Sequence, residues 1–143
     1  MYATTNDIIN MIKPQLQTGI NFETGNVTDE IIYDFIEYAG GELETDIGHM
    51  YTVPLRQYRY QGTLQYPKMI VLAVACKASA MIVNKYFAEA DPGLSERANE
   101  LIARYDGIVK QIITGIGLLP GQKRQAKSHA ISPSIQEAEY KEQ

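Results

Sequence analysis

The chain has 143 residues and a net charge of −4, and its single cysteine, Cys76, excludes an internal disulfide and argues against a structural zinc site. The longest apolar run, Met69 to Cys76, is much shorter than the ~20 residues that cross a bilayer, and the N-terminus lacks the basic segment of a secretory signal. We therefore expect one soluble, intracellular domain, large enough to bury a core without disulfides or metals.

Two helices are predicted in the first third of the chain. Residues 4–13 read as a short helix with a cap among Thr4–Asn6 and Pro14 at its end. After a loop, a long helix is predicted over about 29–49, capped by Thr28. Its apolar residues recur every three or four positions and form one face: Ile32, Ile36, Ala39, Leu43, Ile47 and Met50.

The outward face of this long helix is acidic. Asp34, Glu37 and Glu44 lie largely away from the apolar face, and no base stands at the i+4 position to offset them. Gly40 and Gly41 interrupt the helix at a cost of ~1 kcal/mol each relative to alanine. We interpret the glycine pair as the mark of a close contact or a bend.

Residues 51–66 have strand character with a break. Pro54 has no N–H to donate to a sheet ladder, so this stretch is predicted to be an edge strand or an open loop. The pair Gln61 and Gly62 is compatible with a hairpin turn.

Two more helices follow. Pro67 suits the first turn of a helix that runs to about residue 89 and is apolar almost all round over 69–76, which predicts a central helix. A turn at 91–93 precedes the last helix, predicted over about 95–116. One face of that helix is apolar: Leu101, Tyr105, Ile108, Ile112 and Ile116.

The predicted fold is therefore all-α. It is a small bundle of one short N-terminal helix and three longer helices, with an extended loop or hairpin between the second and third of the four. Residues 1–120 form the helical domain. Residues 121–143 are polar and read as a flexible, extended C-terminal arm. A basic cluster opens the arm: Lys123, Arg124 and Lys127.

The sequence contains no recognisable catalytic or cofactor-binding motif. It has no glycine-rich phosphate loop and no HExxH, and its two histidines, His49 and His129, are far apart. Asp34 and Glu37 stand at i,i+3, a spacing that suits acid–base work or metal binding, but no histidine or base is placed to complete a site. We therefore expect no enzymatic activity, no cofactor and no metal.

The stretch 56–60 allows a nucleic-acid interpretation, because Arg56, Tyr58, Arg59 and Tyr60 could pair with phosphates and stack on bases. Tyr and Arg are also the residues that dominate protein interfaces. Dedicated DNA-binding domains are usually basic, whereas this chain has a pI of ≈ 5.2. A small nucleic-acid-binding regulator is therefore kept as the alternative function.

Charge is divided unequally along the chain. Residues 1–55 carry nine acids and one base, a net −8, and residues 56–143 carry twelve bases and eight acids, a net +4. This division indicates complementary surfaces that could meet between copies of the chain. The simpler interpretation is a solvated acidic helix face.

The order of these elements resembles the head–tail connector (adaptor) proteins of tailed bacteriophages. The resemblance is carried by Met1–Thr4, by Glu42–Leu55 and by the alanine-rich helix that starts near Pro67, and it covers roughly residues 1–118. Related sequences tend to have a base where this chain has Met50. The resemblance implies a structural virion protein that forms a homo-oligomeric ring, commonly of twelve subunits, below the portal. Such a ring extends the DNA channel and provides the platform for the tail or a tail-completion protein.

The resemblance also implies a location and a set of contacts. The protein would occupy the virion neck, after assembly from the host cytoplasm, with transient, non-specific contact with double-stranded DNA and no membrane contact. Subunit contacts would pair acids with the bases of a neighbour: Asp34, Glu37 and Glu44 with Arg56, Arg59 and Arg97. The loop would line the lumen or bridge subunits through Tyr51, Pro54, Tyr58 and Tyr60. The arm with Lys123, Arg124 and Lys127 would dock on the portal.

Overall fold

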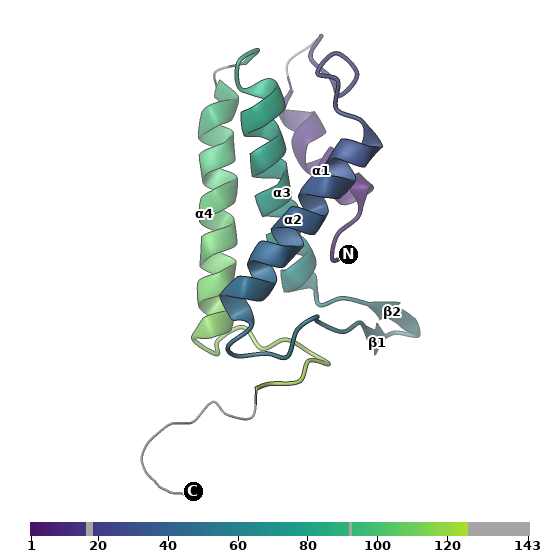
Figure 1. Cartoon of the computed structure of the whole chain (residues 1–143), viewed down its shortest axis with the longest axis vertical. Coiled ribbons are helices and arrows are strands. Elements are labelled where there is room, and N and C mark those ends of the chain that lie inside the picture. Colours follow the sequence, from purple (N-terminus) through teal and green to yellow (C-terminus); the bar gives the residue numbers. More distant parts are fainter. Residues whose placement is uncertain (17–18, 92, 126–143) are drawn as a thin grey trace, which may run out of the picture.

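The structure, a computed structural model, describes residues 1–16, 19–91 and 93–125 (Figure 1). The part of the predicted arm beyond Gln125, with Lys127 and His129, lies outside the described residues. The elements in chain order are α1 (Thr5–Ile12), the 3₁₀ turn η1 (Lys13–Gln15), α2 (Asp29–Ile47), β1 (Tyr58–Tyr60), β2 (Thr63–Gln65), α3 (Lys68–Ile82), the π-helical turn η2 (Val83–Phe87) and α4 (Gly93–Ile113).

The predicted helical bundle is confirmed, but the fold is not purely all-α. Residues 58–65 form an antiparallel hairpin in which Tyr58 pairs with Gln65. The turn at Gln61 and Gly62 is present, and both residues have positive φ, 51° and 82°. Two positive φ values in succession are what a tight two-residue hairpin turn uses. The sequence did not decide between a loop and a hairpin, because residues 58–65 have no continuous buried face that would specify a strand.

The predicted starts of the first two helices are confirmed at α1 and α2. The Thr4 hydroxyl accepts the Asp7 N–H at 3.2 Å, and the Asp7 carboxylate accepts the Thr4 N–H at 2.8 Å. This reciprocal pair satisfies two N–H groups that the first turn leaves unbonded. At the start of α2, the Thr28 hydroxyl accepts the Ile31 N–H at 3.3 Å.

The end of α4 differs from the prediction. The helix stops at Ile113, and Gly115 follows with φ 83°, where its N–H donates to the Ile112 carbonyl at 3.2 Å. A glycine in the left-handed region is a common way to end a helix. Ile116 therefore lies beyond the helix, and its side chain is 80% exposed instead of packing in the core.

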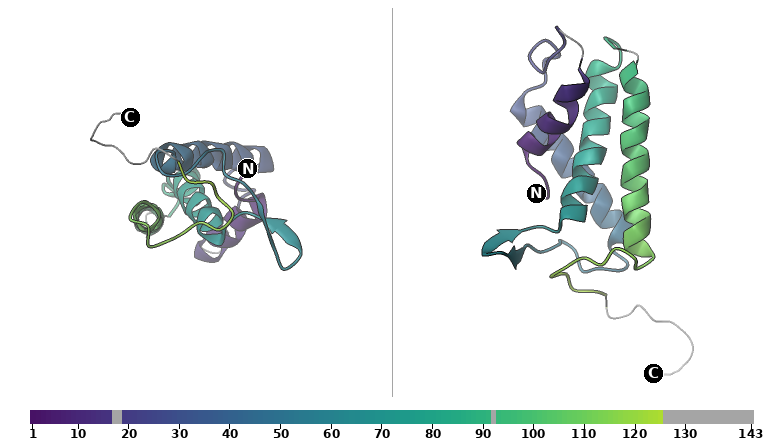
Figure 2. Two further views of the ribbon diagram at one scale, coloured as in Figure 1. Left: turned by 90° about the horizontal axis from the view of Figure 1, so that it is seen from below. Right: turned by 180° about the vertical axis from the view of Figure 1, so that it is seen from behind.

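The central helix is α3, as predicted. It contacts α1, α2 and α4, and Figure 2 shows it between them when the bundle is seen along its length. Its buried residues include four alanines, whose small side chains allow the neighbouring helices to approach closely: Ala73, Ala75, Ala78 and Ala80. The predicted apolar face of α2 packs against this helix, except that Met50 follows the helix end and is only half-buried.

By length and composition, the segment Lys68–Phe87 could also cross a membrane. In the fold, 61% of its most apolar window is buried among the other elements. A helix that is apolar all round is what the centre of a bundle requires.

Candidate assembly surfaces

The hairpin β1–β2 projects from one end of the bundle (Figures 1 and 2). Arg59, Tyr60 and Leu64 are exposed on it, and the Arg59 guanidinium donates to the Gly62 carbonyl at 3.0 Å. A two-stranded hairpin is marginally stable by itself. Its outer part is thus a surface that a partner could cover and stabilise.

The root of the hairpin is held by residues 121–125, which we call the strap. The Lys123 carbonyl accepts the Thr52 N–H at 2.7 Å. The Gln122 side-chain amide bonds both backbone groups of Arg56, accepting its N–H at 2.7 Å and donating to its carbonyl. The first five residues of the predicted arm are therefore part of the folded domain.

Tyr51, predicted to line a lumen or bridge subunits, is instead a core residue. Its side chain is 2% exposed, and its hydroxyl accepts the Leu119 N–H at 3.4 Å. The Arg124 guanidinium of the strap lies 5.6 Å from the centre of its ring. The prediction failed because the strap, distant in sequence, closes over Tyr51.

The segments 48–69 and 114–125 close this end of the bundle, and we call them the basic end. They contain no acidic residue. Their five bases are all exposed: Arg56, Arg59, Lys68, Lys123 and Arg124. Because no acid stands among these bases in sequence, this end offers positive charge to an acidic partner.

Exposed apolar groups lie among these bases. Leu118 is 65% exposed and Leu64 is 53% exposed. A groove of about 290 Å³ runs between Tyr58, Met69 and the 118–120 segment. Protein interfaces combine aromatic and apolar anchors with arginine, so this composition suits a protein partner.

A second surface lies on the outer side of α2, which faces the viewer in Figure 1, and we call it the α2 face. Tyr33 and Tyr38 are 53% and 62% exposed. Asp34 and Glu37 are exposed between them, and no ion pair joins either to another described residue. Gly41 is also exposed, and a Cβ placed there would meet no atom within 4 Å. Of the pair Gly40 and Gly41, only Gly41 lies where its own chain would leave room for a side chain.

The first glycine, Gly40, marks a close contact, as predicted, because a Cβ there would lie 3.2 Å from the Tyr2 ring. The Tyr2 hydroxyl donates to the Glu44 carboxylate and accepts the buried Leu55 N–H at 2.9 Å. Burial and the Glu44 carboxylate raise the pKa of Tyr2 above its ordinary value. Glu44, predicted as an interface acid, is thus engaged within its own chain.

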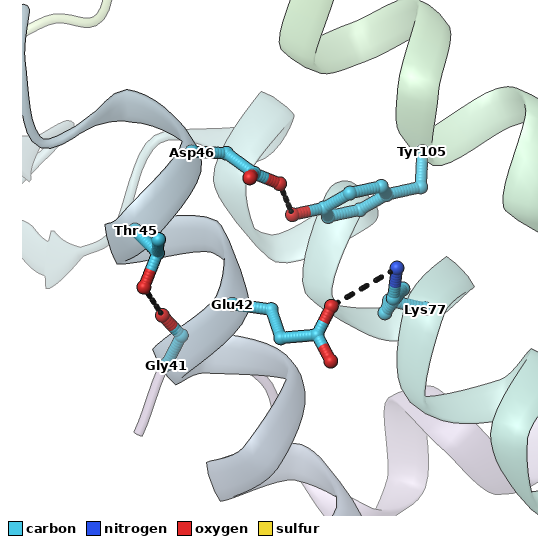
Figure 3. A network of polar contacts seen from close by, with 6 residues as sticks. All are labelled: Gly41, Glu42, Thr45, Asp46, Lys77 and Tyr105. Atoms are coloured by element: carbon cyan, nitrogen blue, oxygen red, sulfur yellow. Dashed lines mark hydrogen bonds and ion pairs between the residues drawn. The ribbon is translucent and has the colours of Figure 1, made fainter.

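Two further acids of α2 are used internally (Figure 3). The buried Tyr105 of α4 donates to the Asp46 carboxylate at 2.6 Å, and burial followed by this bond raises the pKa of Tyr105 above its ordinary value. Lys77 of α3 pairs with Glu42 at 3.2 Å and lies 4.6 Å from the centre of the Tyr105 ring. This network joins the three long helices.

The other predicted interface residues lie at both ends of the helical bundle. Arg97 stands in the first turns of α4, at the end away from the hairpin, and pairs with Glu100 at 3.3 Å. The structure therefore does not group it with Arg56 and Arg59. Pro54 is exposed at the root of the hairpin.

Sequence reasoning missed Tyr2, Lys77 and Gln122 as structural contacts. Their partners stand 42, 35 and 66 positions away, so no local spacing indicated them. Among the described residues, no group of three or more His, Cys, Asp and Glu side chains is placed to hold a metal.

Comparison with known protein families, curated proteins and solved structures finds no match to this chain.

Proposed function

We propose that this protein is a head–tail connector (adaptor) of a tailed bacteriophage, a structural virion protein without catalytic activity. Copies of it would form a ring, commonly of twelve subunits, below the portal. The ring would extend the DNA channel at the virion neck and carry the tail or a tail-completion protein. Assembly would start from subunits in the host cytoplasm.

One observation carries this proposal: a bundle closed by its own contacts exposes acids on the α2 face and five bases on the segments that close one end. Three acids of α2 are bonded to side chains of their own chain: Glu42, Glu44 and Asp46. Asp34 and Glu37 are exposed beside the exposed Tyr33 and Tyr38. Two different but complementary surfaces produce head-to-tail contacts, and such contacts close into rings when the rotation allows it.

In this proposal the strap presents Lys123 and Arg124 to the portal. Contact with DNA in the channel would be transient and independent of sequence. The resemblance of the N-terminal, 42–55 and alanine-rich segments to connector proteins supports the same reading.

The test is the molar mass of the purified protein by light scattering, alone and with purified portal. We expect a ring in at least one condition, and a monomer in both contradicts the proposal. The paired variant Lys123→Ala with Arg124→Ala should retain its helical circular dichroism while losing portal docking. If that variant still binds portal, the strap has no docking role.

The basic end also favours the alternative, a small nucleic-acid-binding regulator, because Arg56, Arg59 and the exposed Tyr60 could engage phosphates and bases. Exposed Leu64 and Leu118 are better suited to a protein partner. Salt-dependent retention of duplex DNA at near-physiological ionic strength, with no ring under any condition, would select the alternative.

A further inference from the structure

The side of α3 opposite α2 is only partly covered. Seen from behind, α3 lies between α1 and α4 (Figure 2, right), and Val71, Leu72 and Met81 of α3 are only half-buried. A groove of about 330 Å³ occurs here, and we call it the α3 groove. Met11 of α1 and Val71 and Leu72 of α3 supply its apolar lining, all half-buried, while Tyr66 and Lys68 stand at its hairpin end.

The α2 face and the α3 groove lie on different sides of α3, and Tyr66 lies between them, lining both the groove and the pocket beside Glu37 and Gly41. In the view from below, α2 and α1 flank α3 from opposite directions (Figure 2, left). A ring of identical subunits needs two unlike faces directed toward successive neighbours. The placement of these two surfaces meets that requirement.

The two surfaces are complementary at their apolar residues and at Lys68, and the acid in the groove lining, Asp7, is bonded to the Thr4 N–H of its own chain. Tyr33 and Tyr38 project from the α2 face, each more than half exposed, and a partner that covers them would bury aromatic surface. The α3 groove offers half-buried aliphatic side chains of the kind that such a ring packs against. At its edge the exposed Lys68 makes no ion pair with a described residue, and neither does Glu37 on the α2 face.

We propose that the α2 face of one copy packs into the α3 groove of the next copy, with Tyr38 against Leu72 and Glu37 beside Lys68. The neighbouring hairpin brings Arg59 to the same acidic face. Gly41, which has no packing role within its own chain, leaves room for the edge of the partner's groove. This inference rests on the proposed ring and specifies the contact that builds it.

The test is disulfide crosslinking in a Cys76→Ala background, which removes the sole native thiol. Under mild oxidation, the paired variant Tyr38→Cys with Leu72→Cys should give a ladder of covalent dimers, trimers and larger species on non-reducing gels. Each single-cysteine variant should give no more than a trace of dimer. The control pair, Tyr38→Cys with Asn99→Cys, places its second thiol on the exposed outer side of α4 and should give no ladder.

The failure of this contact can be told apart from the failure of the proposed function. If light scattering detects a ring but the Tyr38/Leu72 pair gives no ladder, the contact is wrong and the ring stands. If no ring forms alone or with portal, both are wrong. A second variant, Tyr38→Ala, should weaken assembly at least tenfold without lowering the urea midpoint of the monomer, since Tyr38 is exposed. Unchanged assembly of Tyr38→Ala would also overturn the contact.

Discussion

At the scale of single residues, two buried tyrosine hydroxyls fix the geometry of this fold. Tyr2 joins the N-terminus to α2 and to the loop after it, and Tyr105 joins α4 to α2. Each hydroxyl donates to a carboxylate, and such charge-assisted bonds are stronger than bonds between neutral groups. Both contacts lead to predictions that do not depend on the proposed function.

Replacing Tyr2 with phenylalanine should destabilise the protein by roughly 1–3 kcal/mol, because the Leu55 N–H would be buried without an acceptor. Urea denaturation followed by circular dichroism measures this loss. Tyr33→Phe is the matched control, since Tyr33 is exposed and should change stability by less than about 0.5 kcal/mol. Equal midpoints for the two variants would contradict the assigned role of Tyr2.

The raised pKa of Tyr105 predicts a loss of stability in alkali. The folded state holds the phenolic proton more tightly than the unfolded state, whose pKa is near the ordinary 10.0. The stabilisation is complete below that pH and is lost as pH rises toward the folded pKa, with a slope of up to ~1.4 kcal/mol per pH unit. We expect Tyr105→Phe to be less stable than the parent at neutral pH and to lose stability less steeply above pH ~10. Parallel slopes would show that Tyr105 does not contribute.

At the scale of elements, α2 combines two unlike glycines. Gly40 faces the Tyr2 ring, whereas Gly41 faces open space and weakens the helix without any compensation inside the chain. Without a side chain at Gly41, the α2 face has room there for the contact that we propose.

Gly41→Ala should therefore stabilise the isolated monomer by about 0.5–1 kcal/mol through helix propensity. Gly107→Ala, at another exposed and open helix position, should give a similar gain. Gly40→Ala should not, because the added methyl group must displace the Tyr2 ring. Thermal or urea unfolding of the three variants measures these differences, and a loss of stability in Gly41→Ala would show an internal role that we have not identified.

At the scale of the whole molecule, the separation of charge is the property that matters. A closed bundle with an acidic face and a basic end would attract copies of itself in one orientation, and like-charged surfaces would repel in others. Surface charges are screened within ~8 Å at physiological ionic strength, so assembly should weaken as salt is added.

The paired variant Asp34→Asn with Glu37→Gln should weaken assembly by roughly tenfold and flatten its salt dependence. Sedimentation velocity across a salt series measures both effects. The control pair Glu96→Gln with Asp106→Asn removes two exposed charges from α4 and should leave assembly nearly unchanged. If the two paired variants weaken assembly equally, the net charge of the chain controls assembly and the α2 face has no specific role.

The sequence by itself determined the helices, because caps such as Thr4 and Thr28 and the three-to-four-residue recurrence of apolar side chains are local properties of the chain. It also determined the central place of α3, since a helix that is apolar on all sides has no face to expose. The end of α4 was misplaced by three residues because an apolar residue at the right spacing, Ile116, stands beyond a glycine that ends the helix.

Only the tertiary structure decided which charged and aromatic residues are available to a partner. Asp34 and Glu44 look alike in sequence, but the Tyr2 hydroxyl binds Glu44 while Asp34 stays exposed. Tyr51 and Tyr60 look alike as well, yet the strap covers the first and the hairpin exposes the second. The physical reason is that exposure and pairing depend on residues dozens of positions away, whereas caps and periodicity depend on neighbours within one or two helical turns.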